Sequence, residues 1–448
     1  MKALSFPPRH AAIALTSSLL LLPLLTGQSA PKRIDWAGDL RFFEAELPKA
    51  HVDAFHSLKR DQFHRMVSTL IASAPHSTDR QVVAGLMRIT SAIGDSHSGI
   101  HSIPANLRFA IVPISVYLFG DQLGIVAGAP YCQDLIGGKI ISINGHPVKE
   151  VVQHMKLLTE GTNDMTRSAF VVTRLIRPEL LFYEGLAERP DQYDLVVEKD
   201  GKTIARSLTV LGREPDGSPI TGGLSINPLP LQGSDWVSAA PSKLPLWLEN
   251  MDKQFWFAEL PDKSALYIQD RLVLDEKDGQ SLAAFFQEVF KKIEQGRYKT
   301  IVLDIRLNGG GDNTLFEPLK ASFASMPAFQ NKGQFFVIIG RLTQSAAENF
   351  TTFLERNTKA IFVGEPTGES PNHYGDPDLL DLPSSGISIN LSRKRWNDSV
   401  PGDHRPWTQA AIPAPLTLDD FRKGRDPALE AIWKKDHATS DGRLSCRH

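Results

Sequence analysis

Apolar residues recur at helical spacing through residues 34–91. Side chains three or four positions apart lie on one face of a helix, so this pattern is typical of helices that bury one side. The amino-terminal part of the mature chain, residues 31–108, is therefore expected to form a helical domain. The pattern is clearest in Phe63, Met66, Val67 and Leu70, and again in Val82, Val83, Leu86, Met87 and Ile89.

The pattern changes to that of β-strands between residues 109 and 212. Asn144-Gly145 and Asp200-Gly201 are dipeptides that favour tight hairpin turns. A β-rich domain is therefore expected over residues 109–212, with residues 157–190 as an insertion before its last strands. The expected strands are residues 111–116, 140–143, 193–197 and 203–210.

The rest of the chain divides into a connecting segment and an α/β part. Residues 213–262 are expected to be a linker or lid segment, because much of this stretch is rich in Pro, Gly and Ser without periodicity. From residue 263 to 448, short apolar strands alternate with helices, which favours a mainly parallel, covered sheet. The expected strands are residues 266–269, 301–305, 335–339 and 360–363, and the expected helices are residues 280–294, 315–323 and 346–356.

The amino terminus has the pattern of a targeting segment. Lys2 and Arg9 precede an apolar stretch over residues 11–25, and small residues follow it. The apolar stretch is shorter than the ~20 residues that span a bilayer, so residues 1–30 are expected to be a signal peptide. The alternative is a retained amino-terminal anchor. We expect a secreted or periplasmic protein with no stable membrane span after cleavage.

The charge balance excludes one class of partner. The net charge is −2, and without Lys2 and Arg9 there remain 47 basic against 51 acidic residues, a net charge of −4. No nucleic acid partner is expected from this balance. The two cysteines, Cys132 and Cys446, can form a disulfide outside the cytoplasm or stay as unpaired thiols, and they offer no metal-binding pair.

Two motifs follow buried strands of the α/β part. Asp304-Ile-Arg-Leu-Asn-Gly-Gly-Gly311 ends one strand, and Thr343-Gln-Ser-Ala-Ala-Glu348 follows the next. Proteins of this class place their chemistry at the carboxyl ends of strands. Glycines let a backbone amide approach a substrate oxyanion, and a serine at a helix amino terminus suits a nucleophile. The pair of motifs therefore predicts acyl transfer.

The order of the motifs resembles the carboxy-terminal-processing (tail-specific) serine peptidase family, which shares its core with the tricorn protease. The resemblance implies an α/β fold class, with a crotonase-like catalytic core, a helical amino-terminal domain and an inserted PDZ-like β-rich domain. It also implies a peptide or protein substrate and no cofactor. The other matching segments are Ile93-Gly-Asp-Ser-His-Ser98, Gly138-Lys-Ile-Ile-Ser-Ile-Asn-Gly145, Phe362-Val-Gly-Glu-Pro-Thr-Gly368 and Gly424-Arg-Asp-Pro-Ala-Leu-Glu430.

Ser345 is the expected nucleophile, and the amides of Gly310 and Ala346 are the expected oxyanion donors. The alternative for the serine is a capping box, since Ser345-x-x-Glu348 has that pattern. The alternative for the glycines is a plain turn. No Gly-Lys-Ser/Thr follows them, which removes a phosphate-binding loop.

The resemblance implies a base, but the family's lysine is missing. The family has Thr-x-Gly-Lys-Gly where this chain has Thr367-Gly-Glu-Ser370. We therefore expect a tricorn-like branch in which His97 is the base, with Ser96 before it as in tricorn. A structural, hydrogen-bonded role for His97 is the alternative. His373 and His404 are rival bases, because both lie in the carboxy-terminal segment expected to fold back over the site.

An acid from a carboxy-terminal loop supports the serine–histidine pair in the tricorn pattern. The nearest match is Asp403, in Pro401-Gly-Asp-His-Arg405. A solvated loop aspartate is the alternative reading. Glu365 and Asp376 are the other candidates for the supporting acid.

No metal site is expected. His97 and His101 are four residues apart, as in a zinc-binding helix, but Gly99 lies between them. The glutamate of His-Glu-x-x-His is also absent, because Ser98 stands at its position.

The sequence thus predicts a secreted or periplasmic serine peptidase that cleaves peptide bonds through an acyl-enzyme on Ser345. The main alternative is a catalytically inactive protein of the same fold that binds a peptide or a small apolar ligand. A third is an esterase or β-lactam hydrolase, although neither Gly-x-Ser-x-Gly nor Ser-x-x-Lys surrounds Ser345. Peptide capture by the PDZ-like domain and a purely structural role for it both stay open.

Overall fold

The computed structural model describes residues 33–212, 227–230, 233–277, 279–296 and 298–444. The expected signal peptide and Cys446 lie outside these residues, while Cys132 is buried and unpaired. No helix in the described part of the chain is both long enough and apolar enough to cross a bilayer.

Three helices form the amino-terminal part, which confirms its helical prediction. Helix α3 begins where the sequence signals a start, because Thr78 and Gln81 form a reciprocal capping box. The apolar stripes of the helices, including Phe43, Phe63 and Val83, are buried against one another. The helices are α1 (Trp36–Ala50), α2 (Arg60–Ser73) and α3 (Asp79–Ser91).

An antiparallel sheet with the order β2-β3-β4-β6-β7 forms the β-rich part. The turn between β6 and β7 is made by Asp200 and Gly201, both at positive φ, as the sequence predicts. Strand β2 begins at Ile114, after Pro113, and β3 has no counterpart among the expected strands. The strands are β2 (Ile114–Phe119), β3 (Gln122–Gly128), β4 (Lys139–Ile143), β5 (His146–Pro147), β6 (Asp194–Lys199), β7 (Lys202–Ser207) and β8 (Val237–Ser238), and the helices are α4 (Val148–Met155), α5 (Asp164–Phe170), α6 (Val172–Leu175) and α7 (Pro178–Tyr183).

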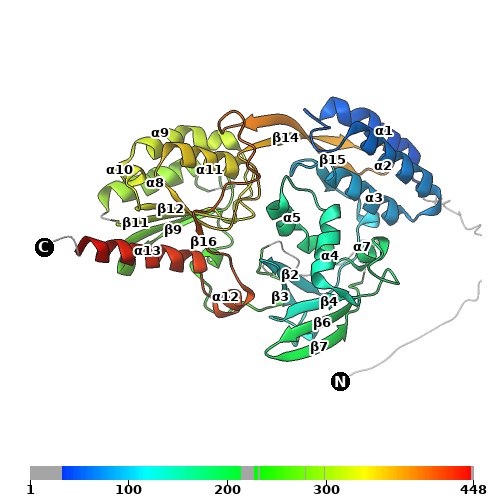
Figure 1. The fold of residues 1–448 in the computed structure, drawn as a ribbon, viewed down its shortest axis with the longest axis horizontal. Coiled ribbons are helices and arrows are strands. Elements are labelled where there is room, and N and C mark those ends of the chain that lie inside the picture. The colour runs from blue at the N-terminus through cyan, green and yellow to red at the C-terminus, as the bar shows by residue number, and fades with distance from the viewer. Residues whose placement is uncertain (1–32, 213–226, 231–232, 278, 297, 445–448) are drawn as a thin grey trace, which may run out of the picture. The chain divides into compact units, whose positions relative to one another are not determined.

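A six-stranded sheet, ordered β16-β13-β12-β11-β10-β9, forms the core of the α/β part. All neighbouring strands are parallel except β9 with β10. Alternate strand residues point to opposite faces, so Leu303 packs under α8, α9 and α11 while Val302 packs against α13 (Figure 1). The strands are β9 (Phe255–Leu260), β10 (Ala265–Asp270), β11 (Thr300–Asp304), β12 (Phe335–Ile339), β13 (Ile361–Gly364) and β16 (Ile412–Pro413), and the helices are α8 (Leu282–Gln295), α9 (Glu317–Ser325), α10 (Pro327–Gln330), α11 (Ala346–Asn357), α12 (Leu418–Lys423) and α13 (Pro427–Leu444).

A long hairpin runs from the α/β part to the amino-terminal helices (Figure 1). Its strands β14 (Asn372–Asp381) and β15 (Ser388–Asn397) pair with β1 (Gly99–Ser102) in a separate three-stranded sheet. At the hairpin turn, the buried carboxylate of Asp39 in α1 accepts hydrogen bonds from the amides of Ser384 and Ser385, at 2.7 and 2.8 Å. The hairpin therefore brings the segment before β1 next to the loops of the α/β sheet.

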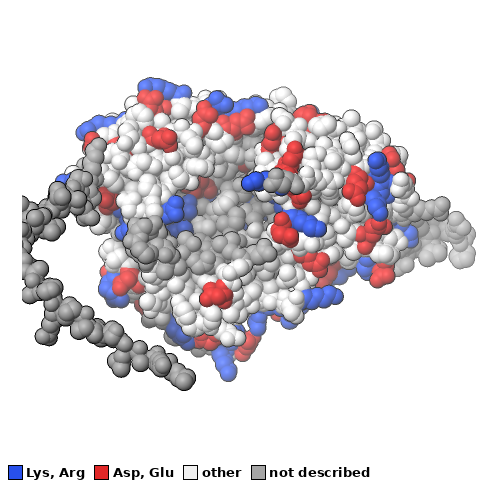
Figure 2. Space-filling view, turned by 180° about the vertical axis from the view of Figure 1, so that it is seen from behind, with Lys and Arg blue, Asp and Glu red and all other residues white. Residues whose placement is uncertain are grey.

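The fold class predicted from the sequence is confirmed: a mixed α/β protein with a helical amino-terminal part and several sheets. The exact domain boundaries stay predictions. Basic and acidic side chains are interspersed among the described residues on the face shown in Figure 2.

Candidate active site

Ser345 sits at a strained turn between β12 and α11. Its φ of 53° and ψ of −129° lie in a region that residues with a side chain rarely adopt. Such strain costs on the order of 1–3 kcal/mol and is concentrated at functional sites. The side chain makes no capping hydrogen bond to α11, so the capping box is not formed. The hydroxyl is therefore left for another role.

The glycine loop after β11 packs directly against this turn. Gly310 has a φ of 96°, and a Cβ there would lie 2.5 Å from Cβ of Ser345 and 3.0 Å from the nitrogen of Ala346. Asn308 ties the two segments together, because its carbonyl accepts a hydrogen bond from the amide of Gln344 at 3.2 Å. Only a glycine permits this close approach at this φ.

The two expected oxyanion donors differ in their present partners. Ala346 is the first residue of α11, so its amide has no intrahelical acceptor and lies at the positive end of the helix. The amide of Gly310 donates to Oδ1 of Asn308 at 2.9 Å. The role of Gly310 stays a prediction, and it requires this amide to exchange Asn308 for a substrate oxygen.

Ser96, His97 and Glu369 form one hydrogen-bonded group. The hydroxyl of Ser96 lies 2.6 and 2.7 Å from the two carboxylate oxygens of Glu369. Nδ1 of His97 is 3.3 Å from Oγ of Ser96 and 3.7 Å from Oε2 of Glu369. Thr162 donates a further hydrogen bond to Glu369, at 2.5 Å. The Glu369 side chain is fully buried, so this carboxylate is shielded from solvent.

The hydrogen-bond chemistry assigns the proton on the His97 ring. Ser96 has a single hydroxyl proton, which goes to the carboxylate, so its oxygen accepts from Nδ1–H of His97. Nε2 of a neutral His97 is then the unprotonated nitrogen. The His97 side chain is 17% exposed, whereas Glu369 behind it is covered. Nε2 is therefore the atom that can take a proton from a hydroxyl.

Backbone contacts bring the loop of Glu369 close to the turn of Ser345. The amide of Gly368 donates to the carbonyl of Thr343, two residues before Ser345, at 3.1 Å. The carbonyl of Gly368 in turn accepts a short hydrogen bond from the hydroxyl of Thr166. The loop after β13, which carries the acid, is thus fixed beside the loop after β12, which carries the serine.

Glu348, in the first turn of α11, is linked through Thr408 to the loop after β13. Its Oε1 accepts a hydrogen bond from Thr408 at 2.7 Å, and the amide of Thr408 donates to the hydroxyl of Thr367 at 2.8 Å. The side chain is completely buried, and burial raises the pKa of Glu348 well above its ordinary value. Burial therefore favours the neutral form of Glu348.

The rival histidines have different surroundings. The ring of His373 stacks on that of His97 with 6.1 Å between centroids, and its Nδ1 lies 3.0 Å from the carbonyl of Ser370. Burial lowers the pKa of His373. His404 is exposed. Among the described residues, His97 is the histidine with a serine and a carboxylate at its Nδ1.

Asp403, the acid expected from the sequence, has other partners. It accepts hydrogen bonds from the hydroxyl of Ser399 at 2.5 Å and from the amide of Arg405 at 3.0 Å, and it forms an ion pair with Arg405 at 2.9 Å. The hydrogen bonds from Arg405 hold the pKa of Asp403 well below its ordinary value. Its role as the supporting acid stays a prediction.

The alternative acids are also paired elsewhere, Glu365 with Arg341 at 2.6 Å and Asp376 with Lys394 at 3.9 Å. Sequence reasoning missed Glu369, although it lies in the segment where the family's lysine was sought. One feature of the sequence could have identified it. Glu369 is a carboxylate shortly after a buried strand, at the same carboxyl edge of the sheet as the other motifs.

The described residues contain no group of three His, Cys, Asp or Glu side chains that could hold a metal ion. His101 lies on β1, and its Nδ1 is 3.4 Å from the side-chain amide of Asn390 on β15.

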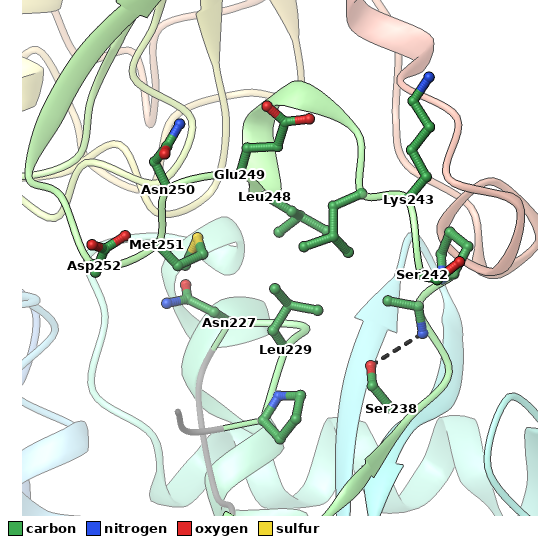
Figure 3. Close-up of a pocket in the computed structure, with 14 residues that line it drawn as sticks. Asn227, Leu229, Ser238, Ser242, Lys243, Leu248, Glu249, Asn250, Met251 and Asp252 are labelled. Carbon is green, nitrogen blue, oxygen red and sulfur yellow. Dashed lines mark hydrogen bonds between the residues drawn. The ribbon is translucent and has the colours of Figure 1, made fainter. Parts of the chain in front are cut away.

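A cavity of about 1030 Å³ lies elsewhere, lined by residues 227, 229–230, 238 and 240–244 and by residues 248–252. Leu229, Leu248 and Met251 line it, and Lys243 and Glu249 stand at its rim (Figure 3). None of the residues around Ser345 or His97 contributes to its walls. The cavity therefore gives no information on the acyl-transfer chemistry.

Known proteins resemble this chain in structure rather than in sequence. Neither the family models nor the curated proteins include a match. Mature CPAF complexed with lactacystin has a TM-score of 0.60 and 12% identity, over 90% of this chain and 98% of that chain. A CPAF mutant gives 0.61 and 12%, over 89% and 95%. The photosystem II D1 C-terminal processing protease gives 0.41 and 14%, over 90% and 97%. At such identity, the likeness to CPAF shows a shared fold.

Proposed function

We propose that this protein is a serine peptidase, with Ser345 as the nucleophile and His97 as the general base. The observation that carries the proposal is the Ser96–His97–Glu369 group, which is linked through the amide of Gly368 to the segment just before a strained serine whose hydroxyl does not cap its helix. A carboxylate that orients a histidine through a hydrogen bond is the arrangement that activates a serine hydroxyl. The substrate class is a peptide or protein.

In the first half-reaction, Nε2 of His97 takes the hydroxyl proton of Ser345 as Oγ attacks the scissile carbonyl carbon. The carbonyl π electrons move onto oxygen, and the amides of Ala346 and Gly310 stabilise that negative charge. Collapse of the tetrahedral adduct breaks the C–N bond, and the imidazolium gives its proton to the leaving amine. An acyl-enzyme on Ser345 remains.

In the second half-reaction, water replaces the amine. The oxygen of the water molecule attacks the acyl carbon while His97 takes one of the water protons. When the ester bond breaks, His97 gives that proton to Oγ of Ser345. Ser96 and Glu369 keep the imidazole oriented and stabilise its cationic form throughout. We assign the supporting acid to Glu369, in place of Asp403, because Glu369 is the carboxylate within 3.7 Å of the His97 ring.

A fluorophosphonate probe tests this proposal directly. We expect covalent labelling of Ser345, identified by peptide mapping, and hydrolysis of unstructured polypeptides such as casein. Ser345→Ala should lose both, with an unchanged unfolding temperature, because the hydroxyl makes no cap that would be lost. Casein hydrolysis that persists in Ser345→Ala would rule out this serine as the nucleophile.

Replacing each candidate carboxylate by its amide shows which of the two, Glu369 or Asp403, supports His97. Glu369→Gln should reduce kcat by orders of magnitude, since the imidazolium loses its anionic support. Asp403→Asn should leave kcat near the wild-type value. The reverse result would return the role to Asp403.

One observation favours a second candidate, an inactive binding protein on the same fold. The amide of Gly310 is already bonded to Asn308, so the oxyanion site has one of its two donors engaged. In that case the intact, folded protein binds peptides without labelling by the probe.

The location is part of the same proposal. The pattern of residues 1–30 supports export, and a peptidase outside the cytoplasm meets peptide substrates there. Detection of a mature chain that begins near residue 31 in the extracellular or periplasmic fraction tests it.

A further inference from the structure

A second histidine–carboxylate pair lies behind the loop that carries His97. Nε2 of His51 and Oδ2 of Asp95 are 2.9 Å apart, and neither side chain has any exposed surface. His51 directly follows α1, and Asp95 stands two residues before His97. Because the pair is closed to solvent, it cannot meet a substrate.

The hydrogen bonds define the charge state of the pair. The amide of Asp53 donates to Nδ1 of His51 at 2.9 Å, so the ring proton is on Nε2 and is donated to Asp95. Burial opposes ionisation of Asp95, but the hydrogen bonds from His51 and from two serines together lower the pKa of Asp95. Asp95 is therefore a buried carboxylate whose charge depends on these donors.

The second oxygen of Asp95 fixes the loop that carries His97. Oδ1 accepts a hydrogen bond from the backbone amide of His97 at 2.9 Å and another from the hydroxyl of Ser392 at 2.9 Å. Ser392 lies on β15, and its carbonyl accepts from the amide of Val52 at 2.9 Å. One carboxylate thus joins the end of α1, the loop of His97 and the long hairpin.

We infer that Asp95, held by His51, is a positioning residue that fixes the backbone of His97 for proton transfer to and from Ser345. The inference rests on the proposed role of His97. Ser96 and Glu369 orient the ring of His97, whereas Asp95 fixes the main chain from which the ring projects. A displacement of ~1 Å in such a group can cost roughly 100-fold in rate.

Substitutions at His51 separate hydrogen bonding from packing. His51→Phe keeps an aromatic ring against His56 and Tyr374 but offers no donor to Asp95. His51→Gln places an amide N–H where Nε2–H was. His56→Gln is the matched control, because His56 stacks on His51 with 5.8 Å between centroids but makes no hydrogen bond to Asp95.

The readouts are the rate of fluorophosphonate labelling at Ser345 and kcat and KM for peptide hydrolysis. We expect roughly 100-fold slower labelling and lower kcat with little change in KM for His51→Phe. His51→Gln should recover most of the rate, and His56→Gln should match the wild type. A merely structural role for His51 does not predict rescue by glutamine.

The inference is overturned if folded His51→Phe labels at the wild-type rate, or if His51→Gln is as slow as His51→Phe. If His51→Phe does not fold, Ser392→Ala takes its place, since it removes one hydroxyl donor from Asp95. A several-fold lower kcat at unchanged KM then supports the inference, and a wild-type kcat overturns it. Absence of labelling in the wild-type protein contradicts the proposed function itself.

Discussion

A serine at positive φ pays a conformational cost that a glycine at the same position would avoid. Ser345 keeps this conformation because its neighbours leave no alternative. Gly310 lies so close on one side that a Cβ built there would be 2.5 Å from Cβ of Ser345, and the amides of Glu348 and Asn349 donate to the carbonyl of Ser345 at 2.8 and 3.0 Å. At the residue scale, the site therefore depends on close contact between one glycine and one serine.

Gly310→Ala tests that contact. The new methyl group would lie 2.5 Å from Cβ of Ser345, at a φ of 96° that alanine rarely adopts. We expect at least ~100-fold slower fluorophosphonate labelling, because the nucleophile turn must shift, and a stability loss of about 1–3 kcal/mol in urea unfolding.

Gly309→Ala is the matched control for Gly310→Ala. A Cβ at Gly309 meets nothing within 4 Å, and its φ is not in the left-handed region. Its labelling rate should stay within a few-fold of the wild type. Equal loss in both variants would mean that loop flexibility, rather than contact with Ser345, sets the rate.

At the element scale, the site is built from loops at the carboxyl ends of three adjacent parallel strands. Strand β11 is followed by the glycine loop, β12 by the turn of Ser345 and β13 by the loop of Glu369. Because these strands are parallel neighbours, their carboxyl ends meet at one edge of the sheet. Helix α11 begins at this edge. Its buried Glu348 accepts a hydrogen bond from Thr408, which is bonded to the loop of Glu369.

Glu348→Gln tests whether burial raises the pKa of Glu348. The pKa of Glu348 is raised by burial in the folded protein, from an ordinary value of 4.5. The folded state therefore binds more protons than the unfolded state above pH 4.5, so this group's contribution to stability falls as pH rises.

A glutamine does not titrate, so the variant should gain in unfolding temperature relative to wild type as pH rises above about 4.5. Glu317→Gln, an exposed surface position paired with Lys320, should show no such trend. A difference between Glu348→Gln and wild type that is constant with pH would mean that Glu348 titrates normally.

At the scale of the whole molecule, the proposed base His97 and the proposed nucleophile Ser345 come from segments that are far apart in the chain. The segment of His97 leads from the amino-terminal helices into β1, and β1 pairs with β15 of the hairpin that lies between β13 and β16 in the chain. Pairing of Gly99 with Asn390 fixes the register of this junction. We therefore expect the proposed catalytic group to depend on docking of the hairpin on α1.

Asp39→Ala tests this docking. The buried carboxylate of Asp39, in α1, accepts hydrogen bonds from the backbone amides of Ser384 and Ser385. In the variant both amides lose their acceptor. We expect a loss of about 1–3 kcal/mol in urea unfolding, the usual cost of leaving such groups unpaired. Labelling of Ser345 should slow as well, because the hairpin also holds the loop of His97.

Asp378→Ala is the control on the same hairpin, since its ion pair with Arg393 is more than half exposed. It should change neither stability nor labelling measurably. A loss of stability in Asp39→Ala without slower labelling would show that the catalytic group forms independently of hairpin docking.

The local pattern of apolar residues was enough to predict a strand wherever every residue of that strand is buried. Residues 335–339 were predicted as a strand and form β12 (Phe335–Ile339), because a short apolar run rich in aromatic and β-branched residues and followed by a glycine is typical of a buried strand. Strand β3 was missed because Gly124 and Gly128 interrupt its pattern. The β14–β15 hairpin was missed because about half of each strand, including Asp376 and Arg393, is exposed and largely polar.

By itself, the sequence determined the fold class, the alternation of strands and helices, and the candidates Ser345 and His97, since these depend on periodicity and on short motifs. Only the tertiary structure brought Glu369 to Ser96, across 273 residues of chain, and paired His51 with Asp95. It also gave Asp403 an arginine partner. The physical reason is that periodicity reports local burial, whereas the partner of a carboxylate depends on how distant segments pack.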